Sequence, residues 1–375
     1  MNRLIVDVGA IRHNAGLVDR WILGHGGTWT FVTKALCGRK SLLAALADVS
    51  PMLADSRLDN LRAIRSVAPR ARTMNLRLPS FSELPELVAL SDLTLHSEGA
   101  VLDAVAAEAA RQRRRHQVIL MVELGELREG ILPGGLEALY RRAAEHESLE
   151  VVGIGANLGC LSGLVPAIEQ FQQMALYREF LELKFDTKLP LLSVATSVAL
   201  PLLREGKLPS SANHFRIGDS VLLGSDLVHG GTIEGLRDDA FLIEAEVVEM
   251  KEKSLSPLGD TSAAIRPFAD FETEDPEPGE RGYRALVSLG HLDTDIASLT
   301  PIDPRVRLAG ASSDLTAVNV AGDSPAFRPG DRIGFRPGYS ALVRLLAGRY
   351  LPPIELIGTE SISPLPAAEA EIPVG

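Results

Sequence analysis

A lysine, Lys34, follows the strand-forming run "WTFVT" and is the first candidate for chemistry in this chain. At the carboxyl end of a buried strand a lysine has apolar walls and water on one side only, an environment that suits Schiff-base chemistry. An unpaired buried ammonium is costly, so a structural lysine held in an ion pair is the alternative. Lys34 is therefore predicted to be either a reactive amine or one half of a salt bridge.

Two later segments could hold a phosphate group. "SVATSVALP" places Thr196 and Ser197 at the end of an apolar run and before a helical pattern, where hydroxyls and free backbone N–H groups bind anions. "HFRIGDSVLLG" adds Gly218 and further N–H groups in the same kind of setting. Serine and threonine at such positions also serve as plain helix N-caps, which is the alternative reading of both hydroxyls.

The elements that must position these residues alternate regularly. From Trp29 to Gly224, short apolar runs alternate with amphipathic helical stretches, as in parallel strands joined by helices. Eight such pairs predict a closed (β/α)8 barrel of the TIM type, with a doubly wound open sheet as the alternative. Active sites of barrels lie at the carboxyl ends of the strands. The expected strands end at or near Lys34, Asp55, Asn75, His96, Arg128, Asn157, Ser197 and Arg216.

A second domain is expected after the barrel. Beyond about Asp226 the pattern changes to strands separated by Gly, Pro and Asp turns, without long helical periods. We therefore expect residues 1–228 to form the barrel domain and residues 229–375 a mostly antiparallel β domain, with which residues 1–10 could pack. The acidic, Pro/Gly-rich segment 254–282 is expected to be a surface loop, and residues 363–375 to be loosely docked or disordered.

Composition and charge exclude several classes of protein. A net charge of -11 argues against a broad nucleic-acid surface. The apolar stretch at the N-terminus is short and no other segment is long enough to cross a bilayer, so neither a signal peptide nor a membrane span is expected. Two cysteines, Cys37 and Cys160, are too few for a disulfide framework or a four-cysteine zinc site, and no metal is expected. A reducing, cytoplasmic setting is the expectation.

These motifs, taken in order, resemble the alanine racemase group of pyridoxal phosphate enzymes. The similarity rests on "ELGELREG", "GIGANLGC", "ATSVALP" and "FRIGDSVLLG", preceded by the lysine and followed by a β domain. It looks strongest for the branch that includes ornithine racemases, through "NHFRIGDSVLLG", "VSLGHLDTD" and "AGASSDL". The resemblance implies a barrel that binds pyridoxal 5'-phosphate, and a homodimer in which the β domain of one subunit completes the active site of its partner.

The resemblance also implies roles for individual residues. Lys34 matches the lysine that binds the cofactor covalently and acts as one of two bases. Arg216 matches the arginine that bonds the pyridine nitrogen, and Arg128 the arginine near the phenolic oxygen of the cofactor and the substrate. The phosphate is expected at Thr196, Ser197, Gly218 and Asp219, the last two through their backbone, and Asn157 stands near the usual histidine of the family as a further cofactor contact.

The second base is where the sequence departs from the family. Alanine racemases carry a tyrosine in the β domain, and the corresponding "SLGHLDTD" has His291, whose imidazole suits proton transfer. Tyr339, in "RPGYSALVR", is the competing candidate, as base or as phosphate ligand. Asp293 and Asp295 could receive the distal ammonium of ornithine or lysine, unless they only build an aspartate-rich turn. Cys37 stands where the family usually has a tyrosine, which puts that contact to the phosphate in doubt.

The expected function is a pyridoxal-phosphate-dependent racemase that interconverts L- and D-amino acids of the ornithine, lysine or alanine class by two-base transfer of the α-proton. An aldolase or decarboxylase acting on D-amino acids with the same fold is the first alternative, because an altered second base is where such a divergence could enter. A non-catalytic protein that binds pyridoxal phosphate is the second. The large β domain argues against it, because barrel-only proteins of that kind lack one.

Overall fold

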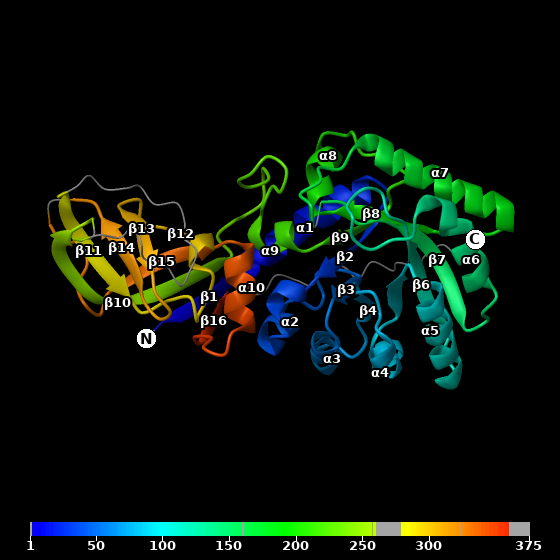
Figure 1. Cartoon of the computed structure of the whole chain (residues 1–375), viewed down its shortest axis with the longest axis horizontal. Coiled ribbons are helices and arrows are strands. Elements are labelled where there is room, and N and C mark those ends of the chain that lie inside the picture. The colour runs from blue at the N-terminus through cyan, green and yellow to red at the C-terminus, as the bar shows by residue number, and fades with distance from the viewer. Residues whose placement is uncertain (1, 160, 257, 260–278, 323, 360–375) are drawn as a thin grey trace. The chain divides into compact units, whose positions relative to one another are not determined.

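The computed structural model describes residues 2–159, 161–256, 258–259, 279–322 and 324–359 of the chain (Figure 1). It divides into two compact units. Ile11–Asp238 form the barrel unit, and Met1–Ala10 together with Asp239–Glu360 form the sheet unit. The division at Asp238 lies ten residues after the boundary at residue 228 that the sequence pattern predicts. Most of the expected loop 254–282 and all of the expected tail 363–375 lie outside the described residues.

Eight parallel strands close the barrel, as predicted, and the open-sheet alternative is wrong. The ring closes because the last strand pairs with the first, with Trp29 opposite Phe215. Each strand is short and most are rich in apolar or β-branched residues, which suits strands buried on both faces. The strands are β2 (Thr28–Val32), β3 (Met52–Asp55), β4 (Arg72–Asn75), β5 (Leu93–His96), β6 (His116–Met121), β7 (Leu149–Gly155), β8 (Leu191–Thr196) and β9 (His214–Ile217).

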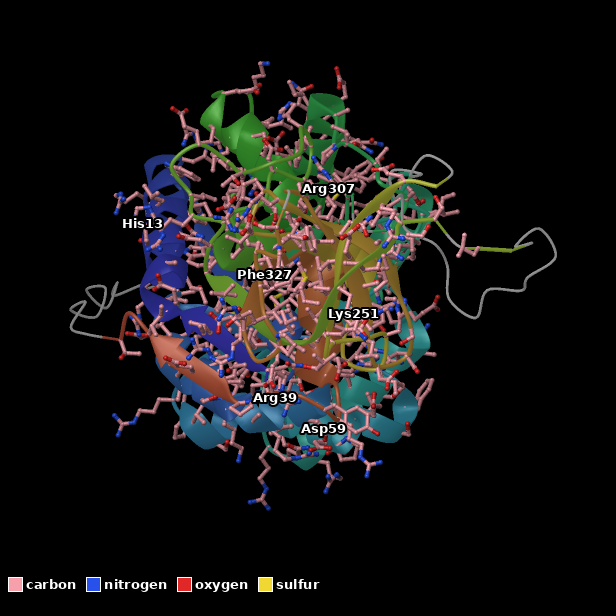
Figure 2. The ribbon with its side chains drawn as sticks, turned by 90° about the vertical axis from the view of Figure 1, so that its left-hand side faces the viewer. His13, Arg39, Asp59, Lys251, Arg307 and Phe327 are labelled. Carbon is pink, nitrogen blue, oxygen red and sulfur yellow. The ribbon has the colours of Figure 1, made fainter. Side chains whose placement is uncertain are left out.

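Helices follow the strands and cover the outside of the barrel (Figure 1). α5 shows why they form where they do: its buried residues Leu102, Val105, Ala106 and Ala109 recur at helical spacing and so make one apolar face. Side chains on the opposite faces point to solvent, as His13 does on α1 (Figure 2). The helices are α1 (Val8–Gly24), α2 (Lys40–Leu46), α3 (Leu58–Val67), α4 (Leu84–Leu90), α5 (Gly99–Arg111), α6 (Leu136–Ala144), α7 (Ile168–Phe185), α8 (Leu200–Arg204) and α9 (Asp219–Leu223).

The interior of the barrel is filled by side chains rather than open. Alternate residues of the strands face inward, so Val32 packs inside while Trp29 points outward and donates its indole N–H to Asp19 of α1. The inner apolar cluster contains Val32, Met52, Ala54, Met74, Leu93, Leu95, Ile119, Met121, Val152 and Leu191. The barrel is thus a rigid support, and its carboxyl end is where groups for chemistry can be presented.

The sheet unit is built mainly of antiparallel strands, in the order β12, β15, β10, β11, β14, β13. The N-terminal strand β1 joins this unit by pairing with β10 and, in parallel, with β16. The unit also contains a helix, α10 (Tyr339–Ala347), which departs from the strands-only expectation. Its strands are β1 (Arg3–Asp7), β10 (Phe241–Ser254), β11 (Arg281–Val287), β12 (Leu299–Pro301), β13 (Val306–Ala311), β14 (Thr316–Val320), β15 (Arg332–Pro337) and β16 (Ile354–Ile357).

None of the helices in the described part of the chain combines the length and the apolar character that crossing a bilayer requires.

Candidate functional site

Lys34 lies just beyond the end of β2, as the first residue of a short 3-10 turn, Lys34–Leu36. The inward-facing positions of the strand, Thr30 and Val32, are followed at the same spacing by Lys34. Its side chain is exposed, and among the described residues it has no hydrogen bond or ion pair. Lys34 therefore forms no salt bridge within the described part of the chain, and the structural alternative for this lysine has no support there.

The residue before the lysine is tied to the next strand through a buried aspartate. The backbone N–H of Thr33 donates to the carbonyl oxygen of Ala54 at 2.8 Å, and its hydroxyl donates to Asp55 Oδ2 at 2.9 Å. Asp55 Oδ1 accepts the backbone N–H groups of Ser56 at 2.7 Å and Arg57 at 3.1 Å. Burial raises the pKa of Asp55, and these hydrogen bonds oppose the shift. Asp55 therefore supports the lysine turn and does not face the barrel mouth.

Arg216, on β9, is a buried cation with a fixed orientation. Its Nη1 donates to the carbonyl oxygen of Ser193 at 2.6 Å and also to the Ser193 hydroxyl. Its Nη2 donates to the carbonyl oxygen of Ala156 at 2.9 Å and to Asn157 Oδ1 at 2.6 Å. Only 5% of the residue is exposed. Four donated bonds from one planar group hold the guanidinium rigidly at the carboxyl ends of β7, β8 and β9.

A neutral histidine lies beneath this arginine. His214 Nδ1 is 2.8 Å from the Ser193 hydroxyl, and its Nε2 is 3.0 Å from the hydroxyl of Thr30. Burial, followed by the charges of Arg216 and Arg72, lowers the pKa of His214 to about 3. The ring is therefore uncharged near neutral pH and positions Ser193 without adding a second positive charge beside Arg216.

Asn157 connects Arg216 to a carboxylate that the sequence did not single out. The amide Nδ2 of Asn157 donates to Glu129, while its Oδ1 accepts from Arg216. Glu129 in turn pairs with Arg128 Nε at 2.7 Å. The side chain of Glu129 is 9% exposed and that of Arg128 is 37% exposed. The structure thus brings three predicted residues, Arg128, Asn157 and Arg216, into one chain of contacts through Glu129.

The other glutamate of "GELREG", Glu126, has a structural task. It is 1% exposed, and its carboxylate accepts the backbone N–H groups of Gly159 at 2.7 Å, Ser162 at 2.9 Å, and Leu161. A buried carboxylate is stable only when it is bonded in this way. Glu126 therefore fixes the loop after β7 next to the loop that carries Arg128 and Glu129.

The predicted phosphate residues gather at the ends of β8 and β9. A register shift between Ser193 and Ala195 places Thr196 opposite Arg216, so both face the same side of the sheet. The hydroxyls of Thr196 and Ser197 have no hydrogen-bond partner among the described residues. Gly218 packs closely against β2, since a Cβ atom there would lie 2.9 Å from the Val32 carbonyl oxygen. Strand β9 therefore ends directly beside the strand that leads to Lys34.

Asp219, the first residue of α9, brings a carboxylate into the same region. Burial raises the pKa of Asp219, while a hydrogen bond from Ser225 and the positive charge of Lys34 oppose the rise. Its Oδ1 is buried without a partner among the described residues. The lysine amine, two hydroxyls and the first N–H groups of α9 form a set of donors on three adjacent strands, which fits a phosphorylated ligand.

The remaining predicted residues belong to the sheet unit. His291 is half-buried, and its backbone N–H donates to the carbonyl oxygen of Ser312 at 3.0 Å. Tyr339 is half-buried at the first position of α10. The choice between them as second base, and the meeting of either with Lys34, stays a prediction.

Both predicted substrate aspartates have contacts of their own. Asp293 Oδ2 accepts the backbone N–H of Gly290 at 2.8 Å, and burial raises the pKa of Asp293. Asp295 accepts the hydroxyl of Ser340 and lies 3.8 Å from Arg344 Nη1. Asp293 thus closes a turn, and Asp295 joins that turn to the beginning of α10. These contacts are the ones an aspartate-rich turn would make, and a substrate role remains a prediction.

Residues 6–226 match the family model described as "Alanine racemase, N-terminal domain". The chain is 31% identical over 353 residues to the ornithine racemase of Acetoanaerobium sticklandii, a match that covers 93% of this chain and 98% of the relative. The chain belongs to the alanine racemase family. It is also 31% identical over 353 residues to the lysine racemase of Thermotoga maritima, covering 93% of this chain and 97% of that relative. Membership makes it an amino-acid racemase.

Solved structures of the family share this fold. The alanine racemase of Bartonella henselae with covalently bound pyridoxal phosphate has a TM-score of 0.72 at 14% identity, covering 95% of this chain and 99% of that one. The biosynthetic alanine racemase of Pseudomonas aeruginosa has a TM-score of 0.71 at 20% identity, with the same coverage. At these identities the likeness establishes the barrel and the sheet unit.

Cys37 is the position where this racemase departs from the tyrosine expected in its family. The residue ends the lysine turn in a left-handed conformation, with φ of 49°. Its thiol lies 3.6 Å from the carbonyl oxygen of Lys34 and 3.7 Å from that of Ala35. Burial raises the pKa of the Cys37 thiol, so the group stays protonated near neutral pH. Cys37 therefore closes the lysine turn locally.

Proposed function

We propose that this chain is a pyridoxal-phosphate-dependent racemase that interconverts the L- and D-forms of a basic amino acid, ornithine or lysine, by moving the α-proton between two bases. The observation that carries the proposal is the amine of Lys34, without an ion pair in the described chain, at the same end of the barrel as the fixed guanidinium of Arg216. The preference for a basic substrate rests on the ornithine and lysine racemases that match nearly the whole chain.

The residues at the barrel end have the chemistry to hold the cofactor. Lys34 would bind it covalently, Arg216 would face the pyridine nitrogen, and Arg128 would lie near the phenolic oxygen. Thr196, Ser197 and the backbone N–H groups of Gly218 and Asp219 would hold the phosphate, with Asn157 supporting Arg216. When bound, pyridoxal phosphate supplies an electron sink that acidifies the α-hydrogen of an attached amino acid.

Arg216 would direct the chemistry toward racemisation. A guanidinium does not give up its proton, so Arg216 can donate a hydrogen bond to a ring nitrogen but cannot protonate it. Electron withdrawal at the α-carbon is then modest, which favours returning the proton to the same carbon. The four bonds that fix Arg216 keep this donor in place.

Inversion requires a proton acceptor and a proton donor on opposite faces of the α-carbon. Lys34 would serve one face, and His291 or Tyr339 the other. We propose that the enzyme works in the cytoplasm as a homodimer with shared active sites, so that a second base from the sheet unit reaches the lysine of the partner subunit. Asp293 or Asp295 would then receive the distal ammonium of the substrate.

Racemisation can be tested directly with L-ornithine, L-lysine and L-alanine, each in deuterium oxide. We expect loss of optical rotation together with exchange of the α-hydrogen, followed by NMR, and fastest for a basic substrate. Exchange without loss of rotation, or release of carbon dioxide or an aldehyde, would contradict the racemase proposal. The Lys34→Ala variant should lose the visible absorbance of the bound cofactor. If that absorbance persists, Lys34 is not the cofactor lysine.

A further inference from the structure

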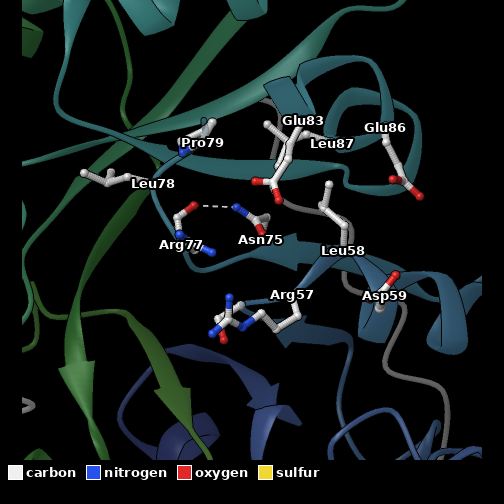
Figure 3. A pocket seen from close by; sticks show the side chains of 11 residues that line it. Arg57, Leu58, Asp59, Asn75, Arg77, Leu78, Pro79, Glu83, Glu86 and Leu87 are labelled. Carbon is white, nitrogen blue, oxygen red and sulfur yellow. Dashed lines mark hydrogen bonds between the residues drawn. The ribbon is translucent and has the colours of Figure 1, made fainter. Parts of the chain in front are cut away.

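A polar cavity lies at the barrel end and is lined by none of the residues assigned to the cofactor. It has a volume of about 210 Å³ and opens between the segments that follow β3 and β4. A cavity of this size has room for several water molecules or for one small molecule. Its walls are Ser56, Arg57, Leu58, Asp59, Asn75, Arg77, Leu78, Pro79, Glu83, Glu86 and Leu87 (Figure 3).

Two arginines without counter-ions line this cavity. The side chains of Arg57 and Arg77 have no ion pair or hydrogen bond among the described residues. Their neighbour Arg62 differs, because it pairs with Asp59 at 2.5 Å and also with Glu86. Both residues are exposed, and a bound anion would pair with their two positive charges. Arginine pairs are also well shaped for a carboxylate.

The beginning of α3 adds backbone donors to the cavity. Leu58 and Asp59 are its first two residues and both line the cavity. Their backbone N–H groups have no partner within the helix, and the helix dipole places partial positive charge at this end. Asp55 occupies the N–H groups of Ser56 and Arg57, so those of the helix itself remain for a ligand.

The opposite wall carries a carboxylate. The carboxylate of Glu83 lies across the cavity from Arg57 (Figure 3). It accepts a hydrogen bond from the hydroxyl of Ser80 at 2.7 Å. A phosphate dianion would be repelled by Glu83, whereas a ligand with both a carboxylate and an ammonium group would satisfy both walls. Leu78, Pro79 and Leu87 supply apolar surface between the charged groups.

We propose that this cavity binds a free α-amino acid as its zwitterion, separately from the amino acid that reacts at Lys34. Arg57 and Arg77 would hold the carboxylate, and Glu83 the ammonium. Leu78 also packs against the apolar cluster inside the barrel, which includes Val32 two residues before Lys34. The site would therefore lie beside the barrel mouth and keep a second amino-acid molecule near the reacting one.

The test measures binding with the catalytic site blocked. The cofactor of the full-length enzyme is reduced with borohydride, and equilibrium dialysis follows labelled L-lysine, L-ornithine and L-alanine, with acetate and inorganic phosphate as comparison ligands. We expect saturable binding of one amino acid per chain. Arg57→Ala and Arg77→Ala should weaken it about tenfold or more, as the loss of a charged hydrogen bond does. Glu83→Gln should weaken the amino acids but not acetate.

Arg70→Ala is the matched control, because Arg70 is also exposed and unpaired in the described chain but does not line the cavity. It should leave binding unchanged. The proposal fails if the reduced enzyme binds no amino acid, if Arg77→Ala binds as tightly as the wild type, or if phosphate binds more tightly than the amino acids. If the purified protein takes up no cofactor at all, that result contradicts the proposed racemase and not the proposed cavity. Amino-acid binding to the cavity is then measured on the same protein without borohydride treatment.

Discussion

The hydroxyl of Thr33 donates a 2.9 Å hydrogen bond to Asp55 Oδ2, so the residue before Lys34 is fixed to the end of the neighbouring strand. The lysine begins a short turn that is closed by backbone hydrogen bonds from Leu36 to Thr33 and from Cys37 to Lys34. This buried contact between β2 and β3 therefore helps to set the position of its amine, together with the backbone hydrogen bond from Thr33 to Ala54.

Thr33→Val should remove that contact while keeping the side-chain shape. We expect a loss of about 1 kcal/mol in the free energy of unfolding, the usual value for one hydrogen bond. We also expect a kcat about tenfold lower, because small displacements of a reacting group are costly. Urea unfolding and racemisation rates measure the two effects. Thr28→Val is the control, since Thr28 lies on the same strand and its hydroxyl has no partner among the described residues; an equal effect there would contradict the explanation.

Glu129→Gln should show whether the carboxylate matters to Arg216. The change keeps an oxygen that can accept from Asn157 but removes the charge that pairs with Arg128. We expect kcat to fall about tenfold, as is typical for partners that orient a group in direct contact with the reacting centre. The visible absorbance of the bound cofactor should shift as well. Glu150→Gln, at the other end of the barrel, is the control, and equal losses in both variants would argue against a special role for Glu129.

Three buried histidines should make the fold sensitive to acid. Burial lowers the pKa of His96 to about 3, of His116 to about 4 and of His214 to about 3. Unfolding restores a pKa near 6.5, so between about pH 4 and 6.5 the unfolded chain binds more protons than the folded one. The free energy of unfolding should therefore fall as the pH falls, by about 1.4 kcal/mol per pH unit for each histidine.

Urea unfolding at several pH values between 4.5 and 7 measures that slope. His96→Gln and His214→Asn should each reduce this slope by about 1.4 kcal/mol per pH unit, which is the contribution of one proton. The exposed His13 provides the control variant His13→Gln (Figure 2). If His13→Gln reduces the slope as much as His96→Gln does, burial of the histidines is not the cause of the pH dependence.

The second base can be identified from the exchange of single enantiomers. If His291 serves the face opposite Lys34, His291→Phe should abolish α-hydrogen exchange from one enantiomer while the other still exchanges through the lysine. Tyr339→Phe should then retain both exchanges. The reverse pattern would assign the role to Tyr339, and unchanged exchange in both variants would exclude both residues.

The barrel was predictable because short apolar or β-branched runs alternate with helical patterns, and all eight predicted runs contain a strand. The direction in which each strand-end residue points was not predictable from the pattern alone. Leu95 faces the inner cluster, so His96 faces the helices, where it shares the hydroxyl of Thr94 with His116. Likewise Ala54 faces inward and Asp55 does not. Which residues of a strand face inward depends on how the strand is aligned with its neighbours, and that register is fixed only when the strands pair.

Other features of the site arise only from contacts distant in sequence. "GELREG" contains two glutamates, and nothing in the motif tells that Glu126 supports the loop after β7 while Glu129 reaches Asn157. The register shift in β8 that places Thr196 opposite Arg216 depends on β9. Strand β12 has three residues, which is too short for a period to be recognised.

Asn157 gives the contact between Glu129 and Arg216 a property that a histidine would not have. A carboxamide does not titrate in water's accessible range, and here its oxygen accepts from a cation while its nitrogen donates to an anion. The link therefore transmits orientation without storing or passing a proton. Any pH dependence that the enzyme shows must then arise from groups other than this carboxamide, which keeps the same donor and acceptor at every pH of interest.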